Sequence, residues 1–245
     1  TEFEKRYPPD RYGEEAGEDA RVWKVYRERA SEKDEDVIEG WNSLLDILLI
    51  FAGLFSAIAT GFIIESYKTL QQDPSEYMAM ALYILVTRPS DSSAQLPPPN
   101  DFKASLTPRW VNGLWFMSLA LSLCVALLSI LVKQWLGEYQ SRMRSRVASQ
   151  RQWARRRRAY HSGMSKWKLD AFISTLPVML HASLFLFLAG LVLFLVEIDA
   201  TLAWLMLWVS TSLFTFYVVV TLLPLWCGDC PTATPLLRQV HAIYR

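Results

Sequence analysis

The chain has 245 residues, of which 52% are hydrophobic and 13% aromatic, and its formal net charge is +1 at pH 7. Three cysteines exclude a disulfide scaffold as the main source of stability. The glycine-rich phosphate loop, the HExxH pair and the GxSxG turn are all missing, so we expect neither enzymatic activity nor a cofactor. Charged residues are nearly absent from four long stretches and crowded between them. This distribution predicts an all-α integral membrane protein, folded as a four-helix bundle.

The N-terminal segment is polar at first and then acquires an apolar periodicity. Residues 1–19 are rich in Pro, Gly and Glu, so we expect them to be disordered. From residue 20 onward, apolar side chains recur at spacings near three, four and seven, which is typical of a helical stripe. This predicts a short amphipathic helix, lying against the membrane or against a basic segment further along the chain. The stripe consists of Trp23, Tyr26, Ala30, Val37 and Trp41.

The first predicted span covers residues 44–64, and about twenty residues are enough to cross a hydrocarbon core. Gly53, Ala57 and Gly61 form a ladder of small residues, which in membrane helices favours close packing of backbones. Asp46 lies seven residues before Gly53 and hence on the same face. We therefore expect this ladder to be a helix-packing face and Asp46 to point into the bundle.

The connection to the second span, residues 65–109, is polar apart from one patch. That patch, residues 77–86 (YMAMALYILV), is too short to cross as a helix and predicts an interfacial one. Three prolines at 97–99 favour an extended polyproline II segment.

The second span is predicted over residues 110–132. Tryptophans at its start and just past its end fit the aromatic belts of a bilayer. No proline interrupts residues 133–160, so we expect the helix to extend into the cytosol and to turn at 161–163. A packing face is predicted at Ser118, Ser122 and Ser129.

The third and fourth spans are predicted over residues 171–196 and 200–223, joined by a three-residue link that requires an antiparallel hairpin. The membrane domain then covers residues 20–228, and residues 229–245 form an exit segment.

The distribution of Lys and Arg predicts the orientation. Eight precede the first span, four lie in 65–109, eleven in 133–175, none in 197–199 and two after the fourth span. Because Lys and Arg favour the cytosolic side of short loops, both termini and the segment 133–175 are predicted to be cytosolic. The organelle is not indicated.

The stretch with the highest density of arginines, residues 151–158, is the candidate interaction site. It suits anionic lipid headgroups, which attract basic residues next to a membrane by about 1 kcal/mol each. Two alternatives stay open: a determinant of topology with a solvated face, and packing against acidic residues of the N-terminal segment such as Glu28 and Asp34. Its position beside the membrane argues against nucleic acid. The candidate lipid contacts are Arg151, Arg155, Arg156, Arg157 and Arg158.

Two ionisable residues, Asp46 and His181, lie within the predicted spans. Such residues are costly in a bilayer and prompt the hypothesis of an ion or proton path. The alternative is local: Asp46 pairs with a basic residue at the interface, and His181 stays neutral against a neighbouring helix.

Cys227 and Cys230 form a CxxC pair, which lacks the ligands for a zinc site because only His241 follows. We therefore expect no metal and consider inert or lipidated thiols instead.

Several segments together resemble a large family of uncharacterised membrane proteins of mushroom-forming fungi, known only as a domain of unknown function. They are WNSLLDILLIFAGLFSAIATGFIIESYKTLQQDP, LSILVKQWL, WKLDAFISTLPVMLHASLFLFLAGLVLFLV and CPTATPL. The resemblance spans about Trp23 to Leu237 and implies an N-terminal membrane domain that precedes a variable cytosolic region. It implies no activity. The chain departs from the family at 230–235, where an aromatic and a basic residue are expected after Cys-Pro.

These observations predict a membrane anchor or assembly module that holds a cytosolic region at an anionic leaflet and forms homo-oligomers through the small-residue ladder. A small channel or transporter using Asp46 and His181 is the alternative. The expected partner is the bilayer, and neither nucleic acid nor an identifiable small-molecule substrate is expected.

Overall fold

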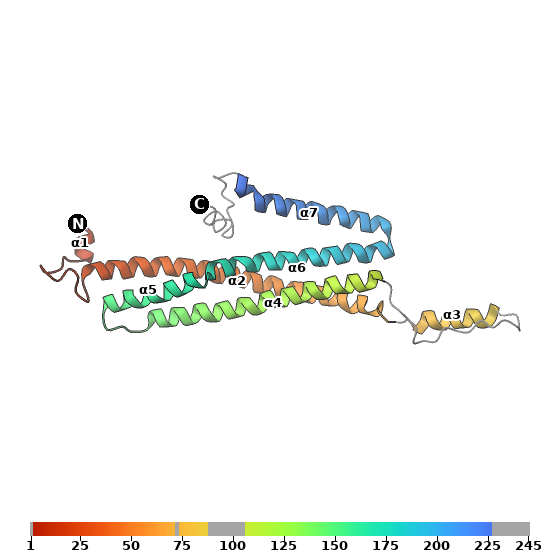
Figure 1. The fold of residues 1–245 in the computed structure, drawn as a ribbon, viewed down its shortest axis with the longest axis horizontal. Helices are drawn as coiled ribbons and strands as arrows, with labels where there is room; N and C mark the ends of the chain where they lie inside the picture. Colours follow the sequence, from red (N-terminus) through yellow and green to blue (C-terminus); the bar gives the residue numbers. More distant parts are fainter. Residues whose placement is uncertain (1, 72–73, 88–105, 227–245) are drawn as a thin grey trace. The chain divides into compact units, whose positions relative to one another are not determined.

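The computed structural model describes residues 2–71, 74–87 and 106–226, and the described residues contain helices but no strand (Figure 1). The all-α prediction is therefore confirmed for this part of the chain. The helices are α1 (Glu2–Arg6), α2 (Arg21–Lys68), α3 (Pro74–Thr87), α4 (Leu106–Arg144), α5 (Gln150–Lys166), α6 (Leu169–Ile198) and α7 (Ala200–Trp226).

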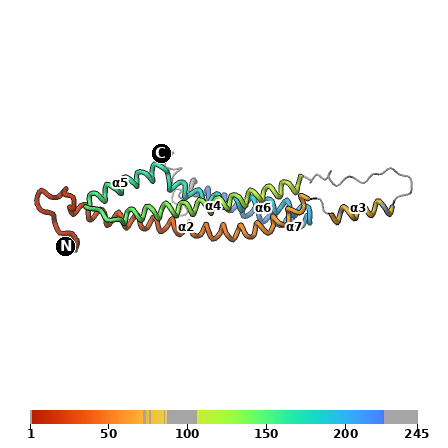
Figure 2. The backbone as a smooth tube through the Cα atoms, turned by 90° about the horizontal axis from the view of Figure 1, so that it is seen from below, coloured from red at the N-terminus to blue at the C-terminus, as the bar shows by residue number. Residues whose placement is uncertain are grey.

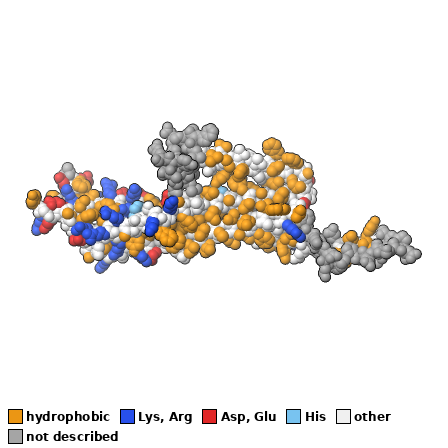
Figure 3. All heavy atoms as spheres, in the orientation of Figure 1, with side chains coloured by type: hydrophobic (Ala, Val, Ile, Leu, Met, Phe, Trp, Pro, Cys, Tyr) orange, Lys and Arg blue, Asp and Glu red, His pale blue; other side chains and the backbone are white. Residues whose placement is uncertain are grey.

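Four of these helices are long and apolar enough to cross a membrane: α2, α4, α6 and the first 24 residues of α7. Each contains one predicted span, so four candidate spans are confirmed by length and composition. Hydrophobic side chains gather over the apolar parts of α2, α4 and α6, whereas charged ones gather over α5 and the start of α2 (Figure 3).

Contacts divide the chain into two compact units, which are described separately. Among the described residues, the first unit comprises 2–51 and 125–178, and the second comprises 52–71, 74–87, 106–124 and 179–226. The first unit therefore contains the start of α2, the end of α4, all of α5 and the start of α6.

The N-terminal helix and the first span, predicted as separate elements, are one continuous helix, α2. Gly40 lies between them, but a helical glycine costs only about 1 kcal/mol relative to alanine, which packing can offset. In the first unit, Ile38 before this position is 3% exposed and Leu45 after it is fully buried, so one face of the helix stays packed throughout. Asp10 caps the helix by accepting the backbone N–H of Arg21 at 2.9 Å.

The predicted extension of the second helix to residue 160 is wrong. The helix α4 ends at Arg144, and a short link leads into α5, which lies beside the end of α4 (Figure 2). The reversal buries Trp153 and Ala154 against Ala30 of α2, whereas a straight helix would leave the tryptophan in solvent.

The predicted turn at 161–163 is also wrong, because Gly163 lies inside α5. The chain turns instead between α5 and α6, where Lys168 has a φ of +48°. Its backbone N–H donates to the carbonyl of Ser165 at 3.1 Å, which satisfies one of the last carbonyls of the helix.

The N-terminal residues differ from the expectation of disorder. They form α1 and a series of turns, and Glu18 and Asp19 contact the start of α5.

The core of the second unit is built where α2, α4 and α6 meet, and it centres on Trp115. This side chain is fully buried, and its indole Nε1–H donates to the carbonyl oxygen of Phe187 at 3.1 Å. Phe187 stacks on it with ring centroids 5.8 Å apart. The buried set is Phe55, Ala59, Ile63, Val111, Trp115 and Phe187.

Serines line the helix contacts of the second unit, as predicted for α4. Ser118 donates to the carbonyl of Ser183 at 2.7 Å, and Ser122 donates to the carbonyl of Ala52 at 3.2 Å. Both α4 serines are fully buried. These bonds satisfy two buried hydroxyls that would otherwise lack a partner.

The small-residue ladder of α2 is not the face that packs in the second unit. Gly53, Ala57 and Gly61 are all exposed, and a Cβ atom built on either glycine meets no atom within 4 Å. The packed residues Phe55, Ala59 and Ile63 each follow a ladder residue by two positions, which places them about half a turn away, on the opposite side of the helix. There they fit against bulky residues of α4 and α6.

The hairpin predicted for the last two spans is observed within the second unit. The rings of Phe185 in α6 and Phe214 in α7 lie 5.1 Å apart. Asp199 joins the helices and accepts the backbone N–H groups of Leu202 and Thr201. These bonds lower the pKa of its carboxyl.

The helix predicted over 77–86 is present as α3. The prolines at 97–99 and the exit segment 229–245 lie outside the described residues.

Candidate functional site

The basic helix α5 is anchored at its N-terminus by two acidic residues of the N-terminal segment. The hydroxyl of Ser149, the N-cap residue, donates to Glu18 at 2.6 Å and accepts the N–H of Gln152 at 3.2 Å. The backbone N–H of Gln150 donates to Asp19 at 3.0 Å. Two carboxylates therefore lie at the positive end of the helix dipole, where negative charge is stabilising.

A second contact joins α5 to the middle of the acidic part of α2. The guanidinium of Arg157 holds both carboxylate oxygens of Asp34, with Nε and Nη2 each 2.7 Å from their oxygens. Only 12% and 20% of these side chains are exposed. Tyr26 accepts a further N–H of the guanidinium at 2.8 Å, and Tyr139 of α4 donates to Asp34 at 3.1 Å. The alternative of packing between arginines and acidic N-terminal residues is therefore observed at Asp34.

This network shifts two pKa values. Hydrogen bonds to Asp34 raise the pKa of Arg157, so that its charge is permanent. Burial, reinforced by the Asp34 carboxylate, raises the pKa of Tyr139 to about 12. Near neutral pH Arg157 is therefore a cation and Tyr139 a neutral phenol.

The shifted phenol predicts a loss of stability in alkali. Because the folded pKa of Tyr139 is about 12 and the ordinary value is 10.0, the unfolded chain loses this proton first. The Tyr139 contribution to the free energy of unfolding is therefore full below pH 10 and falls between pH 10 and 12. Unfolding followed by circular dichroism across this range should show a shallower fall for Tyr139→Phe than for the wild type. An identical fall in both proteins would contradict the assignment.

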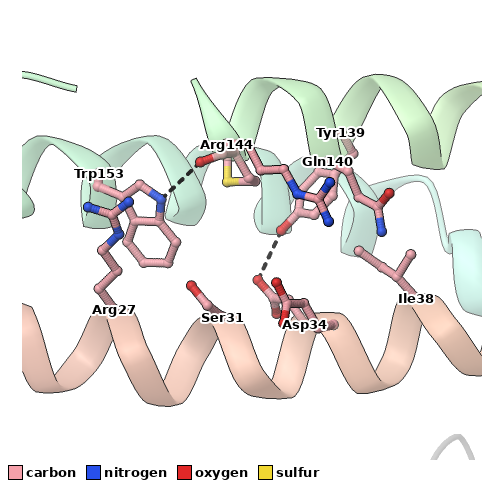
Figure 4. A pocket seen from close by; sticks show the side chains of 10 residues that line it. Arg27, Ser31, Asp34, Ile38, Tyr139, Gln140, Arg144 and Trp153 are labelled. Atoms are coloured by element: carbon pink, nitrogen blue, oxygen red, sulfur yellow. Dashed lines mark hydrogen bonds between the residues drawn. The ribbon is translucent and has the colours of Figure 1, made fainter. Parts of the chain in front are cut away.

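The cavity beside this network is lined by charged residues of both signs. It encloses about 260 Å³ between α2, α4 and α5, and Asp34 and Tyr139 point toward each other at its edge (Figure 4). Arg27 and Arg144 contribute positive charge, and Asp34 and Glu35 contribute negative charge. With equal numbers of each sign, the cavity does not favour an anionic ligand over a cationic one.

The predicted arginine site divides into internal and outward-facing members. Arg151 pairs with Glu18 at 3.4 Å, and Arg156 donates to the carbonyl of Arg142 at 3.1 Å. Together with Arg157, these two make contacts within the first unit. Arg155 and Arg158 are exposed and make no ion pair within the described ranges.

Asp46 does not point into the interior of its unit, contrary to the expectation. Its side chain is 56% exposed and forms an ion pair with Lys133 of α4. The buried face of α2 at this level is formed by Leu45 and Leu48, which leaves position 46 at the side, within reach of the lysine. The alternative of a local pair with a basic residue is what the structure shows.

His181 belongs to the second unit and contacts the Tyr217 ring of α7 at 5.0 Å between centroids.

The cysteine pair and histidine considered as possible metal ligands, Cys227, Cys230 and His241, lie outside the described residues. Among the residues that are described, no group of three or more His, Cys, Asp or Glu side chains could hold a metal ion.

Sequence patterns missed two parts of this arrangement. Glu18 lies in a polar segment without periodicity, and nothing in its neighbours indicates that it meets α5 more than 130 residues later. Gly190 is buried against Trp115, but in the sequence it is one small residue in a long apolar run.

The fold and the site define a class: an all-α protein with four helices able to cross a membrane and a basic helix held by acidic residues. The chain belongs to a family of unknown function, DUF6535, whose sequence pattern matches residues 23–197. The match begins near the start of α2 and ends within the last turn of α6, so α7 lies beyond it. No curated protein and no solved structure shows a significant match to the chain.

Proposed function

We propose that this domain is a membrane anchor and assembly module that holds a cytosolic region at an anionic leaflet. The observation that carries the proposal is that the five candidate lipid-contact arginines divide into members that contact the first unit and members that stay exposed. Glu18 and Asp34 fix α5 in place, and Arg155 and Arg158 remain exposed on the fixed helix. A helix that presents unpaired basic residues beside a membrane suits lipid phosphates.

The orientation that we propose has both termini and α5 in the cytosol. The excess of Lys and Arg in residues 133–175 supports it. The open ladder of Gly53, Ala57 and Gly61 supports assembly into homo-oligomers, since small residues allow close approach of a second helix. The resemblance of the chain segments to proteins of mushroom-forming fungi further suggests a fungal source.

The lipid role predicts a loss of binding when the two exposed arginines are neutralised together. At about 1 kcal/mol per basic residue, the variant Arg155→Gln/Arg158→Gln should bind vesicles containing phosphatidylserine roughly thirtyfold more weakly. Co-sedimentation of the detergent-solubilised chain with these vesicles measures the effect.

The matched control is Lys24→Gln/Lys33→Gln, which removes the same charge from exposed positions on α2. It should bind more tightly than the α5 variant. Equal weakening in both variants would show that net charge alone governs binding, and unchanged binding in the α5 variant would sink the lipid role.

The transport alternative is less well supported because Asp46 is neutralised by Lys133. Ion or proton flux through the reconstituted chain that disappears in Asp46→Asn and in His181→Ala would favour it over the anchor. Absence of flux in the wild type would reject it.

A further inference from the structure

A mainly apolar groove of the first unit has no role in the proposed anchor. It lies between the end of α4, α5 and the start of α6, and it encloses about 480 Å³, within the range of about 300–1,000 Å³ for small-molecule sites. The exposed tryptophans Trp135 and Trp167 border it, and 85% of the Trp167 side chain is exposed. Trp135 follows the predicted second span and Trp167 precedes the third, so the groove lies at the level where a bilayer meets water.

One wall of the groove carries a short pattern associated with sterols. Leu136, Tyr139 and Arg142 follow each other at three-residue intervals, which places them on one face of α4. They match Leu/Val, Tyr and Lys/Arg separated by one to five residues, a pattern proposed for sterol contact that is weak by itself. Here all three residues border the same groove, with the arginine furthest from the span. Leu136 is only 1% exposed, so Tyr139 and Arg142 supply the accessible contacts on this wall.

The charges of the groove favour a neutral polar group over an anion. Its two charged residues, Glu138 and Arg142, pair with each other at 2.5 Å. The guanidinium also donates to the hydroxyl of Tyr160 at 3.0 Å and lies 5.8 Å from the centre of that ring. A phosphate would compete with Glu138 and be repelled by it, whereas a hydroxyl can donate to the carboxylate.

The part of the groove lined by α5 contains two small residues. Ala159 and Gly163 are one turn apart and both line it, and a Cβ atom on Gly163 would meet no protein atom within 4 Å. A rigid ring system can lie on such a surface between aromatic walls. We propose that this groove binds a sterol, with its rings on Ala159 and Gly163 and its hydroxyl at the Glu138–Arg142 pair.

The proposal requires membrane insertion but does not depend on the anionic-lipid role. The test uses the full chain reconstituted in phosphatidylcholine vesicles with a photoactivatable diazirine sterol. Labelled peptides are mapped by mass spectrometry, with unlabelled sterol or phosphatidylserine as competitor. We expect label in α4 or α5 beside the groove, competed by sterol and not by phosphatidylserine.

The blocking variant is Gly163→Phe, which fills open space and improves the helix propensity of the position. It should reduce groove labelling at least fivefold. Gly137→Phe is the matched control, because Gly137 is equally open and does not line the groove, and it should label like the wild type. Ala159→Phe is a second blocking variant that decides the question if the first fails to fold. Arg155→Gln/Arg158→Gln should leave labelling unchanged.

Three results would overturn the proposal. The first is wild-type labelling in a folded blocking variant, and the second is label spread evenly over the four spans without saturation. The third is equal competition by phosphatidylserine, which would make the groove a phospholipid site.

Discussion

Replacing Gly190 with alanine is expected to destabilise the second unit by about 1–3 kcal/mol, the usual penalty for overpacking a core. A Cβ atom at this position would lie 2.6 Å from Nε1 and 2.7 Å from Cδ1 of Trp115. The indole has no room to retreat, since it is fully buried and contacts Phe187 and Phe194. Any displacement would also weaken its hydrogen bond to the carbonyl of Phe187.

The measurement is the free energy of unfolding in mixed micelles, titrated with a denaturing detergent. Gly61→Ala is the matched control, because that glycine lies in another candidate span with open space around it. Its stability should equal or slightly exceed that of the wild type. Gly190→Ala is further expected to cost less in a Trp115→Leu background, because the clashing ring is gone. If Gly190→Ala is as stable as Gly61→Ala, the close approach of α4 and α6 is wrong.

Replacing Asp34 with alanine is expected to destabilise the first unit by about 3 kcal/mol, the lower end of the cost of breaking a buried ion pair. Both partners are mostly buried, and the guanidinium of Arg157 binds both carboxylate oxygens. Its loss would leave a permanent cation in the contact between α2 and α5 and would leave the Tyr139 hydroxyl without its acceptor. Thermal unfolding followed by circular dichroism is the measurement.

Glu32→Ala serves as the control because Glu32 lies on the same helix and its pair with Arg29 is largely exposed. Exposed pairs contribute roughly 0–1 kcal/mol, so its effect should be small. Adding Arg157→Leu to Asp34→Ala should recover part of the loss, since an apolar pair removes the unpaired charge. Equal effects of Asp34→Ala and Glu32→Ala would show that the buried network does not stabilise the unit.

The four candidate spans could be predicted from the sequence because their composition is set by the bilayer. An apolar run of about twenty residues has few alternatives to a helix, since every backbone polar group must be paired within it. The hairpin of α6 and α7 was predictable for a similar reason, because a three-residue link leaves no room for another path. The buried serines of α4 were also predicted correctly.

The end of α4 could not be predicted, because the residues after it suit a helix well. The break at 145–149 depends on tertiary contacts: Trp153 and Ala154 are buried against Ala30, and Glu18 and Asp19 hold the start of α5. These partners are more than 100 residues apart in the chain, and local patterns do not encode such distances.

The packing face of α2 shows a second limit. The ladder of Gly53, Ala57 and Gly61 is spaced for one side of a helix, and Ala52, Ala59 and Ile63 are spaced for the opposite side. Which set packs inside the unit depends on the shapes of α4 and α6, chiefly Trp115 and Phe187. The number of arginines free to contact lipid was also overestimated, because three of the five candidates contact other residues of the first unit.

The central claim, a four-span domain with the basic helix α5 on the cytosolic side, is tested most directly by cysteine labelling. The native cysteines are replaced by serine, and one cysteine is introduced by Ser162→Cys in α5 or by Glu197→Cys at the end of α6, both exposed positions. Sealed vesicles with the cytosolic face outward are treated with a membrane-impermeant maleimide. We predict that Ser162→Cys labels at once and that Glu197→Cys labels only after permeabilisation. The reverse pattern, or immediate labelling of both variants, would contradict the account.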